Sequence, residues 1–304
     1  MKIVVLSNPA SGRGRAQHRL EVVRSLAGQQ GVDLHIQFTE RPGEAARTGE
    51  LAPGSAGALA RAAVESGADL VVAAGGDGTI GEVVHGLLGS SIPLGILPLG
   101  TGNDFVRTVG LPIDPEAALQ VWTHGEDRRI DVVQGPHGCF LNVAGCGFDA
   151  EVALRVNQGY RWVSGTAAYL LAVLETLRKA RPKRLHLVID GQEHTFEMML
   201  CALANARFYG GGMVIAPSAS VEDGLMDLVV VGNVSRWEFL RALPRVFRGT
   251  HLQHPKVTYL QGRRVELTGP EPLPLLADGE TIGMTPAVFE VLPRALALRV
   301  PRLT

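Results

Sequence analysis

The first ~130 residues alternate short apolar runs with amphipathic segments. The runs that predict strands are Ile3–Leu6, Asp33–Phe38, Asp69–Ala74 and Leu94–Leu97. Between them, apolar residues follow a helical period at positions 16–27 and 80–88. Strands that alternate with helices are typical of a mostly parallel sheet, so an α/β domain is expected here. Ligands of such sheets bind at the carboxyl ends of the strands.

From about Ile130 the pattern changes to many short strands, with helices predicted at Gly165–Ala180 and Ser235–Arg248. The strand runs are Ile130–Val133, Cys139–Val143, Leu185–Ile189, Phe196–Ala204, Leu228–Val231, Val257–Leu260, Val265–Thr268 and Ala287–Leu292. This order predicts a second, β-rich and largely antiparallel domain. We place the domains at 1–128 and 129–304, and a return of the last few residues to the first domain stays open.

Composition narrows the function class. With 46% hydrophobic and 19% charged residues in 304, the chain is typical of a globular protein. The three cysteines form no CxxC pair and leave one thiol over, which fits a reducing cytoplasm. The longest apolar run, Ala167–Leu174, is far shorter than the roughly 20 residues that span a bilayer, and the N-terminus lacks the apolar core of an export signal. We therefore expect a cytoplasmic protein that meets lipid only at a membrane surface.

The formal net charge of −1 argues against a dedicated nucleic-acid partner, but basic residues gather in two tracts. Residues 152–188 hold seven Arg and Lys against Glu175 alone, and residues 234–265 hold seven against Glu238 alone. In the second tract, Arg241, Arg245 and Arg248 share one helical face, which suits an anionic membrane surface. A solvated helix face is the alternative.

A glycine-rich turn follows the third predicted strand and leads into a helix. Its residues are Gly75, Gly76, Asp77, Gly78, Thr79 and, one turn later, Gly81. Glycines let the backbone approach a phosphate, and the helix N-terminus offers free N–H groups. Gly76, Gly78 and Gly81 also match GxGxxG, so a dinucleotide fold is a rival interpretation. A carboxylate such as Asp77 repels phosphate unless a cation intervenes, which favours a metal–nucleotide complex.

Two similar turns follow other strands. Gly100, Thr101 and Gly102 precede Asp104, for which a plain helix cap is the alternative role. The segment from Asn8 to Gly12, which contains Ser11, follows the first strand. Because the carboxyl ends of parallel strands share one edge of a sheet, these turns are predicted to converge there.

These motifs together resemble the diacylglycerol kinase catalytic domain family, which includes bacterial diacylglycerol and related lipid kinases and, more distantly, sphingosine and ceramide kinases. The resemblance rests on Asn8–Gly12, Gly75–Thr79, Gly100–Asp104, Asp131, Asn142–Asp149, Tyr209–Gly212, Ala216–Pro217, Glu222–Leu225 and Asp278–Glu280 in that order. It covers essentially the whole chain. It implies a Rossmann-like nucleotide-binding domain followed by a β-rich, sandwich-like domain.

The resemblance also implies roles. The residues that would hold ATP and its metal are Asn8, Ser11, Thr39, Gly75, Gly76, Asp77, Gly78, Thr79, Gly81, Gly100, Thr101 and Asp104. Asp223, with main-chain oxygens of Ser220 and Leu225, would form a structural Mg²⁺ site; a hairpin turn is the alternative for Asp223. One of Asp278 and Glu280 would be the general base, and the sequence does not choose between these two. Asp77 would be a further catalytic residue.

One departure from the family lies between Thr39 and Asp69, where an insertion of about ten residues within 40–60 is expected. Together with the motifs, the resemblance leads us to expect an ATP- and Mg²⁺-dependent lipid kinase that converts diacylglycerol to phosphatidic acid at a membrane surface. The sequence leaves the oligomeric state open, with a homodimer as one possibility. The alternatives are a kinase of a soluble acceptor such as NAD, suggested by GGDG, and a non-catalytic nucleotide-binding regulatory module.

Overall fold

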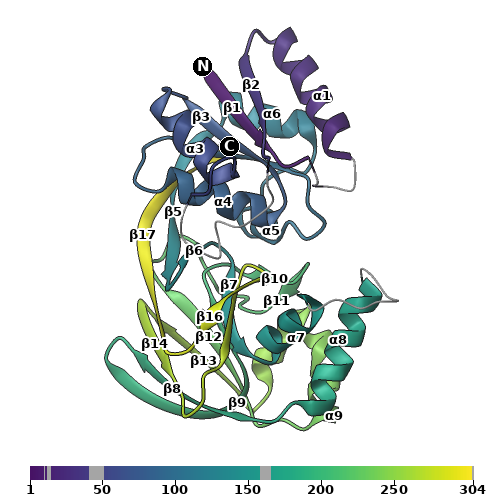
Figure 1. The fold of residues 1–304 in the computed structure, drawn as a ribbon, viewed down its shortest axis with the longest axis vertical. Helices are drawn as coiled ribbons and strands as arrows, with labels where there is room; N and C mark the ends of the chain where they lie inside the picture. Colours follow the sequence, from purple (N-terminus) through teal and green to yellow (C-terminus); the bar gives the residue numbers. More distant parts are fainter. Residues whose placement is uncertain (10, 12–14, 41–50, 158–165, 303–304) are drawn as a thin grey trace. The chain divides into compact units, whose positions relative to one another are not determined.

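The computed structural model, shown in Figure 1, describes residues 1–9, 11, 15–40, 51–157 and 166–302. The chain divides into two compact units. Unit 1 contains Met1–Val132, Val221–Asp223 and Leu292–Thr304, and unit 2 contains Val133–Ser220 and Gly224–Val291. The assignment of functional domains to 1–128 and 129–304 stays a prediction.

Unit 1 is built on a parallel sheet. Its strands are β1 (Lys2–Ser7), β2 (Asp33–Phe38), β3 (Leu70–Gly75) and β4 (Leu94–Pro98). They pair in the order β4-β3-β1-β2, with β17 (Ala287–Val300) beside β4. Every residue of β3 and β4 is buried, as expected for parallel strands covered on both faces. The predicted α/β architecture is confirmed.

Helices connect these strands. They are α1 (Arg15–Gln29), α3 (Ala56–Glu65), α4 (Asp77–Leu87), α5 (Asp104–Val109) and α6 (Pro115–His124). The backbones of α3 and α4 approach closely because glycines lie at their crossing, where a Cβ on Gly86 would be 2.2 Å from the Gly57 carbonyl oxygen. The carboxylate of Glu82, on α4, accepts a hydrogen bond from the backbone N–H of Ala56 and so caps α3.

Unit 2 is an antiparallel β structure. Its strands are β6 (Gly138–Phe140), β7 (Val143–Gly147), β8 (Lys183–Ile189), β9 (Gln192–Ala204), β10 (Phe208–Tyr209), β11 (Met213–Val214), β12 (Met226–Gly232), β13 (Val257–Gly262), β14 (Arg264–Thr268), β15 (Pro274–Ala277) and β16 (Glu280–Met284), with β5 (Glu126–Gly135) and β17 shared with unit 1. They pair in the order β16-β15-β7-β9-β8-β14-β17, and β12 joins β9 to β13. The predicted β-rich, antiparallel class is confirmed.

Three helices and a 3-10 turn cover one face of this β structure (Figure 1). They are α7 (Phe148–Asn157), α8 (Thr166–Lys179), α9 (Arg236–Val246) and the 3-10 turn η2 (Thr250–Gln253). Along β9, Leu200 and Ala202 face these helices, whereas Cys201 and Leu203 face a second apolar core between the strands. This alternation is the period of two of a strand buried on both faces.

Two local predictions are wrong. The single strand predicted at Cys139–Val143 is two strands, β6 and β7, because the backbone N–H groups of residues 141–143 bond to a side chain instead of to a neighbouring strand. Helix α7 was not predicted, since its ten residues carry only a weak amphipathic pattern. No helix among the described residues is long and apolar enough to cross a membrane.

Candidate nucleotide and acceptor sites

The glycine turn after β3 requires its glycines for steric reasons. A Cβ on Gly75 would lie 2.4 Å from the Cβ and Oγ1 of Thr79, so only glycine leaves room for that buried hydroxyl residue. By contrast, Cβ atoms on Gly78 and Gly81 would meet no atom within 4 Å. Packing within the chain therefore explains the first glycine but not the other two, whose open surroundings leave room for a ligand.

The turns at 75–79 and 100–104 lie against each other. A Cβ on Gly100 would be 2.6 Å from the Cα of Gly76, and the N–H of Leu99 donates to the carbonyl oxygen of Gly75 at 2.8 Å. Asn103 adopts a left-handed conformation with φ of 50° and donates from its side chain to the Gly100 carbonyl. The convergence predicted from the strand order thus occurs through direct backbone contact.

Asp77 holds the two turns together. One carboxylate oxygen accepts from the backbone N–H of Asp104 at 3.2 Å, and the other accepts from Phe105 at 3.1 Å. These are the first N–H groups of α5, which have no partner within the helix, so the carboxylate caps α5 and meets the positive end of its dipole. Asp77 is half-buried and anchors another helix, so it has a structural task as well as any contact with a ligand.

Asp104 lies at the start of α5 and is buried, with 6% of its surface exposed. Thr101 in the same turn is exposed. The helix cap position is held by Asn103, and its side chain makes no capping bond, so the alternative role of Asp104 as a plain cap does not describe its position. A buried carboxylate beside an exposed hydroxyl and a helix N-terminus suits a metal–phosphate complex.

The ends of β1 and β2 complete this edge. The N–H of Thr39 donates to the Ser7 carbonyl at 2.9 Å, and the N–H of Ser11 donates to the Asn8 carbonyl at 3.0 Å. The hydroxyls of Ser7 and Thr39 are both buried without a hydrogen-bond partner among the described residues. Ser7 was missed by the sequence analysis, because one serine at the end of a strand carries no pattern. Part of the expected insertion, at 41–50, lies outside the described residues.

The acidic motif of unit 2 is a two-residue hairpin between β15 and β16. Asp278 and Gly279 both have positive φ, 45° and 90°, which is the geometry of a type I′ turn. The Asp278 carboxylate accepts three backbone N–H bonds, from Leu141 at 2.9 Å, Asn142 at 3.0 Å and Val143 at 3.1 Å. The three N–H groups occupy the oxygens of this carboxylate and fix its position. Glu280, the other acid of the pair, is half-buried at the start of β16.

Further polar residues support this hairpin. The side chain of Asn205 donates to the Leu141 carbonyl at 2.8 Å, and its backbone N–H donates to the Asn142 carbonyl. Asp149, at the start of α7, lies against β7, where a Cβ on Gly145 would be 2.4 Å from one carboxylate oxygen. Burial raises the pKa of Asp149 to about 7. Asp149 is the last residue of the Asn142–Asp149 motif, in which the sequence indicates no role for it.

Cysteine chemistry does not belong to this site. Burial, followed by the charge of Asp278, raises the pKa of the Cys139 thiol to about 12. The pKa of Cys146 is also raised, by its hydrogen bond to Cys201 and by burial. A thiolate nucleophile is therefore absent at neutral pH from these positions.

The predicted Mg²⁺ ligands lie in one loop before β12. Gly224 has φ of 74°, which turns the chain sharply between Asp223 and Leu225. The predicted donor set of one carboxylate and two main-chain oxygens, those of Ser220 and Leu225, fits the oxygen preference of Mg²⁺. No cluster of three or more His, Cys, Asp or Glu side chains suited to a metal occurs in the part of the chain that the structure describes. The three positions stay a proposal.

Comparisons with known proteins place these sites in a family. Residues 2–135 match the diacylglycerol kinase catalytic domain, and residues 142–300 match a family described as the YegS C-terminal NAD kinase beta sandwich-like domain. A diacylglycerol kinase of Mycobacterium tuberculosis is 35% identical over 99% of this chain and 96% of its own. One of Bacillus subtilis is 33% identical over 98% of this chain and 96% of its own.

Solved structures agree on the fold. A crystal structure titled as a diacylglycerol kinase of Bacillus anthracis has a TM-score of 0.71 at 22% identity and covers 98% of this chain and 96% of its own. A second chain of that organism reaches 0.78 at 24% identity, covering 98% and 94%. The predicted resemblance is confirmed. The chain belongs to the diacylglycerol kinase family and is a kinase with an alcohol group as acceptor.

Proposed function

We propose that the protein transfers the γ-phosphate of ATP to the hydroxyl of diacylglycerol, giving phosphatidic acid and ADP. The observation that carries the proposal is the joined pair of glycine turns, at 75–79 and 100–104. The Asp77 carboxylate links them by accepting hydrogen bonds from the first N–H groups of α5. Such an edge suits a polyphosphate. The acceptor is inferred from the relatives named diacylglycerol kinase, which match nearly the whole chain.

In this proposal unit 1 binds the nucleotide. The open space at Gly78 and Gly81 admits phosphate oxygens, which the free N–H groups at the N-terminus of α4 then contact. The remaining contacts come from the backbone and hydroxyl groups of Asn8, Ser11, Thr39, Gly75, Gly76, Thr79, Gly100 and Thr101. The buried, unpartnered hydroxyl of Thr39 supports its inclusion.

Asp77 and Asp104 would hold Mg²⁺ or its water at the phosphates, and Asp223 with the main-chain oxygens of Ser220 and Leu225 would hold a structural Mg²⁺. When bound, the cation neutralises phosphate charge and orients the polyphosphate. Asp77 keeps the two turns in register, and Asp104 presents its carboxylate beside the start of α5.

We assign the general base to Glu280 and a positioning role to Asp278. The carboxylate of Asp278 accepts hydrogen bonds from three backbone N–H groups. Glu280 is the other acid of the same hairpin and begins β16. Glu280 accepts the hydroxyl proton as the acceptor oxygen bonds to the γ-phosphorus and the bond from phosphorus to the β–γ bridging oxygen breaks. The electron pair of that bond leaves with ADP. Asp278 fixes the 141–143 loop and the hairpin on which Glu280 stands.

The test is transfer of labelled γ-phosphate from Mg²⁺-ATP to a panel of lipid alcohols in mixed micelles: diacylglycerol, sphingosine, ceramide and phosphatidylglycerol. NAD runs in a parallel tube, because the C-terminal match is described as NAD kinase beta sandwich-like. Labelled phosphatidic acid supports the proposal. Label on NAD alone, or on another lipid in preference, overturns the assigned acceptor, and ATP binding without any labelled product supports a regulatory module.

A further inference from the structure

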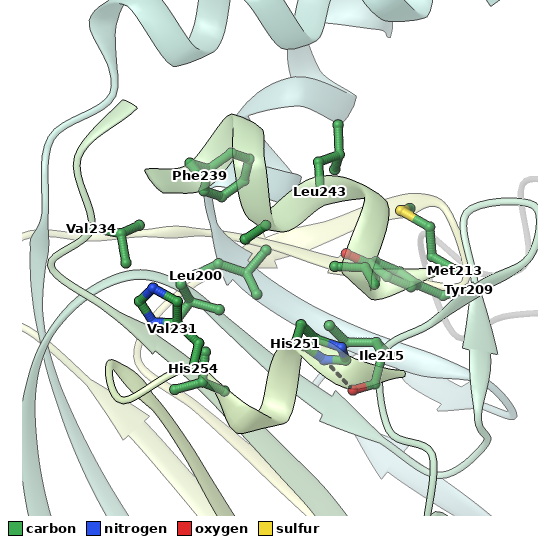
Figure 2. Close-up of a pocket in the computed structure, with 13 residues that line it drawn as sticks. Leu200, Tyr209, Met213, Ile215, Val231, Val234, Phe239, Leu243, His251 and His254 are labelled. Atoms are coloured by element: carbon green, nitrogen blue, oxygen red, sulfur yellow. Dashed lines mark hydrogen bonds between the residues drawn. The ribbon is translucent and has the colours of Figure 1, made fainter. Parts of the chain in front are cut away.

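Helix α9 has two contrasting faces. Its inner residues Phe239 and Leu243 line an apolar cavity of about 70 Å³ above β9 and β12, with His251 of η2 at another wall (Figure 2). Its outer side carries Trp237, which is 73% exposed, and the adjoining Phe247 is 54% exposed. None of the residues of α9 is fully buried. The helix is thus incompletely packed on its own unit while it exposes two large aromatic side chains.

The outer face is also strongly cationic. Arg236, Arg241, Arg245 and Arg248 are exposed, and none of them forms an ion pair within the described residues. Positions 237, 241, 245 and 248 recur at helical spacing, so Trp237 and three arginines form one stripe.

The single acid of this region does not offset that charge. Glu238 accepts from the backbone N–H of Ser235 at 2.6 Å and pairs with Lys256 Nζ at 3.0 Å. The backbone bond from Ser235 and the pairing with Lys256 lower the pKa of Glu238 to about 2, so its negative charge is fixed and is committed to these partners. The four arginines therefore face solvent as net positive charge.

Part of the other basic tract, residues 152–188, lies in the same helical layer. Helix α8 packs on the same apolar cluster as α9, through Val173 and Leu177 on α8 and through Phe239 on α9. At its end α8 exposes Arg178 and Lys179, and Leu174 is 56% exposed. Cations with interspersed aromatic and aliphatic side chains are the composition of an interfacial membrane helix.

We propose that the outer face of α9 docks on an anionic lipid bilayer, with its arginines at the lipid phosphates and with Trp237 and Phe247 at the level of the headgroups. The inference rests on the proposed function, since diacylglycerol resides in a membrane. A lipid surface is favoured over an acidic protein because large aromatic side chains, Trp237 and Phe247, are exposed beside the arginines, and aromatic rings next to cations suit the headgroup level of a membrane.

The test is co-sedimentation with vesicles of phosphatidylcholine alone or with equal parts of phosphatidylglycerol, without ATP. The test variants are Arg241→Gln with Arg245→Gln, and Trp237→Ala. The matched control, Arg24→Gln with Arg263→Gln, makes the same change of net charge at exposed arginines on α1 and beyond the end of β13. Thermal melting of each variant checks folding.

The wild type is expected to bind the anionic vesicles, less tightly as salt is added, and the neutral vesicles weakly. Loss of two arginines weakens binding about 30-fold. Trp237→Ala weakens it roughly ten-fold, and the control binds like the wild type. Equal binding by the α9 double variant and the control overturns the proposal, as does a wild type that binds neither vesicle or binds only an acidic protein such as casein.

Kinase turnover in neutral detergent micelles separates this inference from the proposed function. The α9 variants are expected to keep wild-type turnover there, because detergent presents the substrate without an anionic surface. If no lipid is phosphorylated in micelles, the proposed function fails, while the vesicle result still decides whether α9 docks.

Discussion

Both units carry an aspartate whose carboxylate accepts hydrogen bonds from backbone N–H groups, but the donors differ: they begin a helix in unit 1 and lie between two strands in unit 2. In unit 1, Asp77 accepts two bonds from the first turn of α5. In unit 2, Asp278 accepts three bonds from the 141–143 loop, which belongs to no helix. Each aspartate has a second acid near it, Asp104 in unit 1 and Glu280 in unit 2.

The comparison shows how a motif divides its work. An acid whose oxygens accept backbone N–H bonds fixes the geometry of its turn. In the proposed mechanism the neighbouring acid of the hairpin, Glu280, is the one that accepts the proton. On that proposal Asp278 positions the hairpin of Glu280, whereas in unit 1 Asp77 both caps α5 and, with Asp104, would hold Mg²⁺.

The largest effect is expected in unit 2. Glu280→Gln should lower kcat about 10²- to 10⁴-fold, because the amide cannot accept the hydroxyl proton. ATP affinity and the melting temperature should stay near wild type. Steady-state kinetics in mixed micelles and thermal melting measure these quantities.

Asp278→Asn is the matched change on the same hairpin. It should lower the free energy of unfolding by about 1–3 kcal/mol, because the backbone N–H groups of residues 141–143 lose a charged acceptor. A severe loss of kcat in Asp278→Asn without any loss of stability, together with an active Glu280→Gln, would reverse the two roles.

Two glycine substitutions in unit 1 distinguish the packing of the joined turns from their role in ligand binding. Gly100→Ala should destabilise the fold by roughly 1–3 kcal/mol, since its Cβ would lie 2.6 Å from the Cα of Gly76. Gly78→Ala should leave stability unchanged or slightly raised, because its Cβ meets open space within a helix. ATP affinity should nevertheless fall in Gly78→Ala, as measured by calorimetry. If Gly78→Ala bound ATP normally, the phosphates of ATP would not bind at this turn.

Asp149 differs from Asp77 and Asp278, because few donors hold its buried carboxyl group. Its carboxyl accepts one bond from the neighbouring Ala150 N–H, and its other oxygen has no hydrogen-bond partner among the described residues. Burial raises its pKa from 3.8 to about 7. The folded protein thus holds this proton more tightly than the unfolded chain, so the contribution of Asp149 to stability declines as the pH rises through that window.

Asp149→Asn should therefore be more stable than the wild type at pH 8, on the order of 1–3 kcal/mol, with a smaller difference at pH 5. Urea unfolding at the two pH values gives both numbers. A difference that does not change with pH would show that Asp149 ionises as freely in the folded protein as in the unfolded chain.

The smallest loss of stability is expected at Asp77. Asp77→Ala should lower the free energy of unfolding by about 0.5–2 kcal/mol through loss of the α5 cap. Urea unfolding without nucleotide isolates this term. Unchanged stability would mean that the carboxylate has no role in the fold, and the comparison with Asp278 would fail.

The sequence predicted the layout of the fold well, because buried parallel strands and antiparallel strands differ in their local patterns. The four strands of unit 1 and the glycine turns at their ends needed only short-range signals. The links made by Asp77 and Asp278 could not be seen, since they span 27 and more than 130 residues of sequence. The division of Cys139–Val143 into two strands follows from the second of these links.

The most direct measurement of the central claim uses one reaction that contains Mg²⁺-ATP labelled at the γ-phosphate, diacylglycerol in mixed micelles and NAD. Label is expected in phosphatidic acid with the wild type and is expected to be lost with Glu280→Gln. Label in NAD phosphate, with unlabelled lipid, would contradict this expectation.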